Sequence, residues 1–226
     1  MKSVLTISLL FFTSAIYSQQ LKQVTFSYDG SLAYFTLATD QNILIRISQD
    51  GQLLEFGSEE MSLRSSNYYN PKLQPYMGRV EMYGNGTDPA LQGKPRYIGA
   101  TAINWYAQYE VAEKVGRLKM IGRMAIDYYD HFADKSLQGK MKSIGNLELT
   151  YYSSIADNEA YKGKLKSISN NLITYYSSFD DRQVSGKLKS IGSLNYAWYT
   201  SFDLNRGGLK TGAYRSVLNG VMYIIQ

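Results

Sequence analysis

Few side chains in this sequence are equipped for catalysis. The chain has one histidine, His131, and no cysteine, which excludes a cysteine–histidine dyad, a disulfide framework and a zinc site with the usual ligands. A Ser-His-Asp triad would need His131, and no Gly-x-Ser-x-Gly elbow accompanies it. We therefore expect His131 to be a surface residue, and we expect no catalytic residue, no metal site and no cofactor.

Paired carboxylates are the remaining route to catalysis, because a glycosidase needs only two. The candidates are Asp134, Asp157, Asp180-Asp181 and Asp203. They recur at the same loop of successive repeats, which favours solvated turn residues over a catalytic pair. The spacing also matches no EF-hand or nonapeptide calcium motif. An enzyme that acts on polysaccharide through these loop carboxylates stays the alternative hypothesis.

Basic and aromatic residues recur more strictly than the carboxylates. Five glycines, spaced 23, 23, 24 and 23 residues apart, each begin a repeat: Gly93, Gly116, Gly139, Gly163 and Gly186. Counting each glycine as position 0, positions 1 and 3 are basic, position 5 is Ile, and positions 12 and 13 are aromatic in all five copies. The candidate binding residues are the cations of positions 1 and 3 and the rings of position 12: Lys94, Arg96, Arg117, Lys119, Lys140, Lys142, Lys164, Lys166, Lys187, Lys189, Trp105, Tyr128, Tyr151, Tyr175 and Trp198.

Ordered Lys beside Tyr and Trp can hold an anionic polymer, such as an acidic polysaccharide or extracellular nucleic acid, by charge and stacking. The tryptophans can also stack on sugar rings. The competing interpretation is structural: the same residues are cross-strand pairs that stabilise a sheet, with charges that keep exposed strands soluble. Because every copy repeats the pattern, as architecture alone would require, the sequence favours the structural interpretation.

Each repeat has the pattern of a β-hairpin. Positions 1–5 and 8–16 are strand-like, and the three clearest copies have Gly-Asn, Ser-Asn or Gly-Ser at positions 6–7, which suits a tight turn. Gly99 and Gly122 begin the same turn in the first two copies. With this turn, one face of the Gly139 copy is expected to carry Ile144, Leu147, Lys142, Leu149, Lys140 and Tyr151. The other face is expected to carry Ser143, Glu148, Met141, Thr150 and Tyr152. Neither face is purely apolar, which predicts a thin open sheet or a solenoid-like layer.

Two arrangements of the repeats compete. A parallel β-solenoid would stack equivalent cations about 4.8 Å apart, whereas an array of hairpins separates them by two strands, about 9.6 Å. Like charges repel much less at the larger spacing, so the charge pattern favours the hairpin array. The predicted fold class is all-β: an antiparallel β-hairpin repeat array, an extended open sheet or solenoid-like, with about 23 residues per unit.

Segments such as Gly163-Lys-Leu-Lys-Ser167 and the downstream Tyr175-Tyr176 resemble the MORN and YwqK-type repeats, which are short hairpin units rich in Gly, Lys and Tyr. The resemblance covers residues 93–207 at most. The usual Tyr-x-Gly opening occurs once, at Tyr161-Lys162-Gly163, and the Ile-Gly turn and Phe-Asp ending depart from those families. It implies an extended array used for contact or scaffolding, with no catalytic residue to carry over.

The first residues have the layout of a signal peptide. Lys2 precedes an apolar stretch from Val4 to Phe12. Small residues follow at Ser14, Ala15 and Ser18, and we expect cleavage after Ser18. The apolar stretch is too short for a membrane-spanning helix, so the protein is expected to be exported to the periplasm, the cell surface or the medium. The predicted organisation is a signal peptide (1–18), an N-terminal β region with degenerate repeats (19–92), five repeats (93–207) and a closing segment (208–226).

The hypothesis from sequence is an exported, tyrosine-rich β-repeat protein that acts as a structural or binding module, with 21 Tyr in 226 residues. Its net charge is −3 over residues 19–92 and +5 over residues 93–207. Possible partners are an anionic polysaccharide, a cell-envelope component or another protein. A less favoured alternative is an outer-membrane β-barrel, whose lipid face should lack the two basic residues that the first strand of each unit carries.

Overall fold

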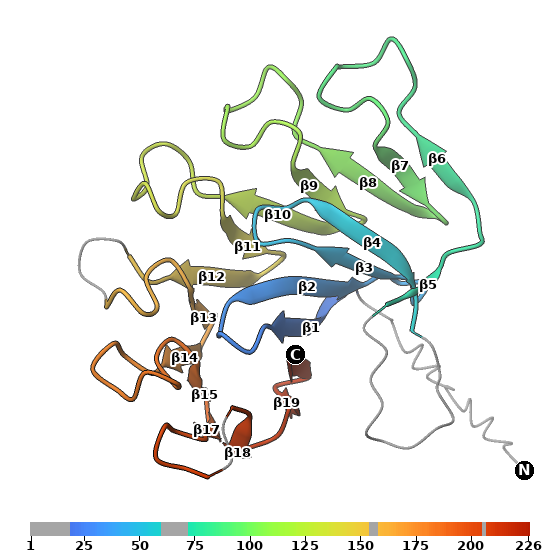
Figure 1. The fold of residues 1–226 in the computed structure, drawn as a ribbon. Helices are drawn as coiled ribbons and strands as arrows, with labels where there is room; N and C mark the ends of the chain where they lie inside the picture. Colours follow the sequence, from blue (N-terminus) through green and yellow to red (C-terminus); the bar gives the residue numbers. More distant parts are fainter. Residues whose placement is uncertain (1–18, 60–71, 154–157, 205–206) are drawn as a thin grey trace, which may run out of the picture.

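The computed structural model describes residues 19–59, 72–153, 158–204 and 207–226, and it folds them into twenty β-strands without a helix (Figure 1). The all-β prediction is confirmed. The predicted signal peptide, residues 1–18, lies outside the described residues. Within these four ranges, no helix has the length and apolar character needed to cross a membrane.

Seven strands form an N-terminal sheet in the order β19-β20-β1-β2-β3-β4-β5. They are β1 (Gln20–Phe26), β2 (Leu32–Ala38), β3 (Leu44–Ile47), β4 (Leu53–Ser58), β5 (Gln74–Pro75), β19 (Arg215–Leu218) and β20 (Val221–Ile225). Asp29-Gly30 and Asp50-Gly51 lie in the turns that connect β1 to β2 and β3 to β4, and both glycines have positive φ. Strand β20, which lies in the closing segment, pairs parallel with β1.

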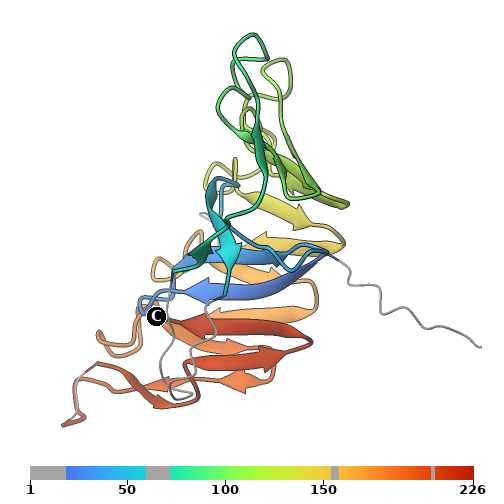
Figure 2. The same cartoon turned by 90° about the vertical axis from the view of Figure 1, so that its right-hand side faces the viewer.

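Eleven strands form the repeat sheet, in which every neighbour in space is also a neighbour in sequence, from β16 to β6. They are β6 (Val80–Met82), β7 (Pro95–Ile98), β8 (Thr101–Trp105), β9 (Leu118–Ile121), β10 (Met124–Tyr128), β11 (Met141–Ile144), β12 (Leu147–Tyr151), β13 (Leu165–Ile168), β14 (Asn171–Tyr175), β15 (Leu188–Ile191) and β16 (Leu194–Asn195). All pairs are antiparallel, so each repeat is one hairpin of an open array, as predicted. Figure 2 shows the hairpins following one another in sequence order.

The turn register is the predicted one. In the third copy Ile144 pairs with Leu147 and Ser143 with Glu148, so two residues make the turn. Its first residue, Gly145, has φ +57°, and Ser169 takes φ +48° at the same place in the fourth copy. The leading glycines also have positive φ, between 71° and 78°. Each repeat therefore needs a residue tolerant of the left-handed region at position 0 and again at position 6.

The predicted faces are wrong at two positions, because each hairpin joins the next through a β-bulge. Between β10 and β11, Asp127 pairs with Ser143 and Tyr128 with Met141, which leaves Lys142 as the extra residue. The bulge turns Met141 to the same face as Ile144, where both side chains are buried, and turns Lys142 to the opposite, exposed face. The same shift recurs between β8 and β9, between β12 and β13, and between β14 and β15.

One face of the repeat sheet is consequently apolar, not mixed. Positions 2, 5, 10 and 12 point inward in every copy, and the N-terminal sheet covers them (Figure 1). Backbone bonds join the layers where the bulges free an N–H group: Met141 donates to the carbonyl of Gln49 at 2.9 Å, and Leu118 donates to that of Gly51 at 3.3 Å. The molecule is thus a two-layer structure with one core, in place of the thin layer expected from the sequence.

Partial repeat units flank the five complete ones. Met82 pairs with Pro95 as Tyr128 pairs with Met141, so β6 is the second strand of an earlier unit. At the other end, Trp198 of β17 (Ala197–Trp198) pairs with Leu209 of β18 (Leu209–Thr211). This pairing places Gly207 at position 0 of a sixth, incomplete unit.

Candidate functional site

The cations of position 1 lie over the rings of position 12 in their own repeat, and together they form the inner ladder. The distances from cation to ring centroid are 4.7 Å for Lys94 and Trp105, 5.5 Å for Arg117 and Tyr128, 5.2 Å for Lys140 and Tyr151, 5.4 Å for Lys164 and Tyr175, and 4.8 Å for Lys187 and Trp198. Such contacts contribute roughly 0.5–1 kcal/mol each, and more when they are desolvated.

The same cations also link neighbouring repeats. Lys140 Nζ donates to the carbonyl of Gly163 at 2.5 Å and Lys164 Nζ to that of Gly186 at 2.7 Å. Lys94 and Arg117 bond to the carbonyls of Gly116 and Gly139 in the same way. Burial lowers the pKa of the four lysines in this ladder, Lys94, Lys140, Lys164 and Lys187. Four of the five position-1 cations therefore bind the leading glycine of the next repeat.

The rings of position 12 are buried between the two sheets, with exposed fractions of 1–6 %. The Nε1 of Trp105 and Trp198 and the hydroxyls of Tyr128 and Tyr175 donate at 2.7–2.8 Å to the carbonyl of position 2 in the same repeat. Trp and Tyr are interchangeable here because both carry a donor at the far end of the ring. In this conformation the five rings offer no open face on which a sugar or base can stack.

The cations of position 3 lie on the opposite, outer face, and three of them contact the tyrosine of position 13 in the preceding repeat. The distances from Nζ to ring centroid are 5.1 Å for Lys119 and Tyr106, 5.4 Å for Lys166 and Tyr152, and 5.5 Å for Lys189 and Tyr176. We call this row, with Arg96 and Lys142, the outer ladder. Lys119 is paired with Glu110 at 2.9 Å, whereas Lys142, Lys166 and Lys189 are exposed.

The outer ladder is built on a rigid polar surface. The tyrosines of position 13 in the first four repeats donate their hydroxyls to the carbonyl of position 10 in the next repeat, as Tyr129 does to Leu149 at 2.9 Å and Tyr152 to Ile173 at 2.8 Å. Threonine and serine hydroxyls bond across the strands beside them, at 2.6 Å between Thr174 and Ser190. The ring faces are thus fixed before any ligand arrives.

The loop carboxylates stabilise turns. Asp180 accepts the N–H of Ser177 at 2.6 Å, and Asp203 accepts that of Thr200 at 2.7 Å. The bond from Ser177 Oγ lowers the pKa of Asp180, and the bond from Lys210 Nζ lowers that of Asp203 to about 2. These groups are ionised acceptors at neutral pH. Asp134 likewise accepts the N–H of Ser136 at 2.8 Å. Asp157, another predicted candidate in this series, lies outside the described residues.

No family model, no curated protein and no solved structure matches this chain. The geometry of its own residues is therefore what identifies its candidate sites.

His131 is exposed, as expected for a surface residue. Its ring contacts that of Phe132 at a tilt of 39°, with 3.9 Å between centroids, and its Nδ1 lies 3.9 Å from Glu113 Oε2. Among the described residues, no group of three His, Cys, Asp or Glu side chains is arranged to hold a metal ion.

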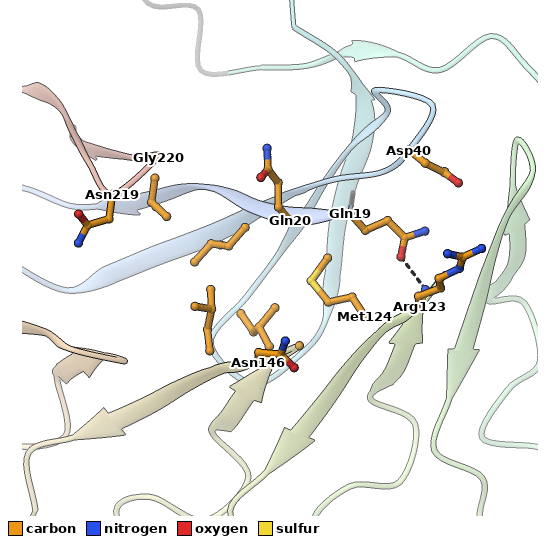
Figure 3. A pocket seen from close by; sticks show the side chains of 13 residues that line it. Gln19, Gln20, Asp40, Arg123, Met124, Asn146, Asn219 and Gly220 are labelled. Carbon is orange, nitrogen blue, oxygen red and sulfur yellow. Dashed lines mark hydrogen bonds between the residues drawn. The ribbon is translucent and has the colours of Figure 1, made fainter. Parts of the chain in front are cut away.

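An amide-lined cleft opens where the tight turns of the repeats meet the N-terminal sheet (Figure 3). It has a volume of about 560 Å³, and Gln19, Gln20, Asn146 and Asn219 contribute to its wall. Gln19 accepts the N–H of Arg123 at 2.5 Å and so joins the two layers at this point. The wall combines these side-chain amides with Arg123 and Asp40.

The inner ladder ends at a second cavity. Lys187 is the one position-1 cation in the described chain whose Nζ has no bond to the next glycine, and a cavity of about 380 Å³ lies between it and Gly207, Gly208, Tyr28 and Tyr214. Tyr28 packs edge-on against both Trp198 and Tyr214, with centroids 6.3 and 5.8 Å apart.

One recurring position is absent from the residues predicted from the sequence. Position 16, at the tip of the long loop between repeats, carries an aromatic side chain that is 86–93 % exposed in each of the four copies described there: Tyr109, Phe132, Phe179 and Phe202. Exposed aromatics in such a row are unusual unless they contact a partner. A signal was present in the sequence, since every phenylalanine between residues 93 and 207 occupies this position.

Proposed function

We propose that this protein is an exported, non-catalytic binding module that holds an anionic polymer along the outer face of its repeat sheet. The observation that supports this function is the outer ladder, in which Lys142, Lys166 and Lys189 are exposed on the face that the N-terminal sheet leaves open. Lys166 and Lys189 each lie over a tyrosine ring of the preceding repeat.

The geometry suits a linear polyanion. Equivalent residues are two strands apart, about 9.6 Å, so the three ammonium groups form a row that a chain with repeated charges can follow. That spacing is close to the Debye length at physiological ionic strength, about 8 Å, so the lysines repel one another weakly while each can attract a separate charge. The tyrosine rings beside them add apolar contact to the electrostatic attraction.

The loop carboxylates give less support to the alternative of an enzyme that acts on polysaccharide. A glycosidase needs one carboxylic acid whose pKa is raised so that it can protonate the leaving group. The pKa values of Asp180, Asp181 and Asp203 are lowered instead, chiefly by side-chain bonds to Ser177, Ser201 and Lys210. The resemblance of the repeats to the MORN and YwqK-type units stays a prediction from the sequence.

The proposal is tested by binding to polygalacturonate and dextran sulfate at increasing NaCl concentration. Replacing Lys142, Lys166 and Lys189 together by Gln should weaken binding by at least about tenfold and flatten its dependence on salt, because three ion contacts are lost. The matching triple replacement by Arg should keep the affinity.

A control with the same change in net charge removes three cations from the loops at Lys135, Lys162 and Arg182. Equal weakening in both glutamine variants would show that only overall charge matters and would contradict an outer-face site. Export is tested separately, by sequencing the N-terminus of the mature protein, which should begin at Gln19.

A further inference from the structure

The exposed aromatic side chains at position 16 form a second surface, the rim row: Tyr109, Phe132, Phe179 and Phe202. The long loops that carry them lie at one end of the strands of the repeat sheet, and the tight turns lie at the other end (Figure 1). Each ring is at least 86 % exposed, so its contribution to the core is small. The rim row is distinct from the outer ladder, because it lies on the loops and not on the strands.

Three of the four loops are tied to the preceding loop directly beside these rings. Asp88 accepts the N–H of Gln108 at 3.0 Å, Asn158 that of Ser178 at 2.9 Å, and Asp181 that of Ser201 at 3.1 Å. Each donor is the residue directly before a ring of the rim row, and each acceptor belongs to the preceding loop. The carboxylate or amide five residues before the next leading glycine therefore ties one loop to the next, so the backbone that carries these rings has little entropy left to lose on binding.

We propose that the rim row binds an extended chain of uncharged sugars, with the apolar faces of separate sugar rings stacked on successive aromatic side chains. Successive loops are offset by two strands, about 9.6 Å at the sheet, and diverge outward. The step from Phe132 to Phe179 is twice as long, because position 16 of the repeat between them is Ile155. A polymer contacts several such platforms at once, and the resulting multivalency compensates for the weakness of each stacking contact.

The charge of the loops favours an uncharged sugar chain over polyanions and anionic lipids as the partner. The loop segments 107–115, 129–138 and 176–185 each carry two carboxylates and one Lys or Arg, so they repel polyanions and anionic lipid headgroups. Carboxylates accept hydrogen bonds only, which matches the hydroxyl donors of a sugar; Asp180, beside Phe179, is exposed. The loops also spread through an arc (Figure 1), so a flat bilayer meets only neighbouring tips while a chain can follow all of them.

The test is native gel electrophoresis of the full chain in gels that contain hydroxyethyl cellulose, mixed-linkage β-glucan, glucomannan or starch. The wild-type protein should be retarded by at least one of these polymers, and the retardation should persist in high salt. Replacing Phe132, Phe179 and Phe202 together by Ser should raise the dissociation constant by at least about tenfold, because three platforms are removed. Since the rings are exposed, this variant should keep the wild-type melting temperature.

Two controls separate this surface from the proposed function. The triple replacement by Tyr at the same positions should retain binding, and the glutamine triple variant of the outer ladder should bind uncharged polymer as the wild type does. The inference is overturned if no polymer of the panel retards the wild-type protein, or if the serine variant binds as well as the wild type. It is also overturned if the same phenylalanines are required for binding to phosphatidylcholine vesicles but not to any glycan.

Discussion

The hydroxyl groups of Tyr175 and Tyr151 are in the same position of adjacent repeats but differ in bonding. Both rings are 5 % exposed and lie beneath a lysine, at 5.4 and 5.2 Å. The Tyr175 hydroxyl donates to the Leu165 carbonyl at 2.8 Å, whereas the Tyr151 hydroxyl is buried without a partner among the described residues. Replacement by Phe removes a bond in one case and an unsatisfied polar group in the other.

The expected changes in unfolding free energy have different signs. Tyr175→Phe loses a net bond of about 1 kcal/mol and leaves the Leu165 carbonyl without this donor, so it should destabilise the protein by about 1–2 kcal/mol. Tyr151→Phe removes a group that was costly to bury and should be neutral or stabilising by up to about 1 kcal/mol. A domain of this size shifts its melting temperature by about 2–4 °C per kcal/mol.

Equilibrium unfolding in urea, followed by circular dichroism, measures both variants against the wild type. Tyr175→Trp supplies a control, because Trp198 shows that an indole donor can make the same bond. If Tyr151→Phe costs as much as Tyr175→Phe, the bond to position 2 does not explain why position 12 holds only Trp or Tyr.

Three further results are expected. Lys140→Met should lower the unfolding free energy by about 1–2 kcal/mol, because the side chain loses its bond to the next repeat and its ring contact. Lys142→Met, at the exposed bulge, should change it by less than about 0.5 kcal/mol. Urea unfolding measures both variants. The pKa of Asp203 is lowered from 3.8 to about 2, so its ionised form stabilises the folded state above pH 4. The difference in unfolding free energy between wild type and Asp203→Asn should be largest above pH 4, and in acid titrations it should vanish as the pH falls through 2. Ser169→Gly should raise the melting temperature, with about 0.5 kcal/mol gained by relieving a positive φ of 48°.

The hairpin array was predictable because its signals are local. The turn dipeptides and the constant distance from glycine to the aromatic pair are enough to predict that Ile144 pairs with Leu147. The bulge was not predictable by alternation, because one extra residue in the strand reverses the predicted faces of Met141 and Lys142. Because Met141 was assigned to the wrong face, both faces were predicted to be mixed, and no second layer was predicted to cover an apolar face.

The covering layer itself depends on contacts between distant parts of the chain. Nothing in the local sequence of Val221–Ile225 indicates a parallel partner, yet β20 pairs with β1 across almost the whole chain. The turn at Gly51 likewise leaves no room for a side chain, since a Cβ there would lie 1.9 Å from the Tyr128 hydroxyl. Such packing follows from the shapes of two sheets and not from the pattern of either one.

The type of aromatic residue at each repeat position distinguishes the rings that stabilise the fold from those that contact a partner. Inside the repeats, positions 12 and 13 hold only Trp and Tyr, and in eight of the ten the N–H or O–H group bonds to a carbonyl of the same or the next repeat. Phe has no such donor, and in residues 93–207 it is found only at position 16, where the ring is exposed. Packing and hydrogen bonding therefore explain the first set. It does not explain why the second set keeps a large apolar ring in water, and contact with a partner does.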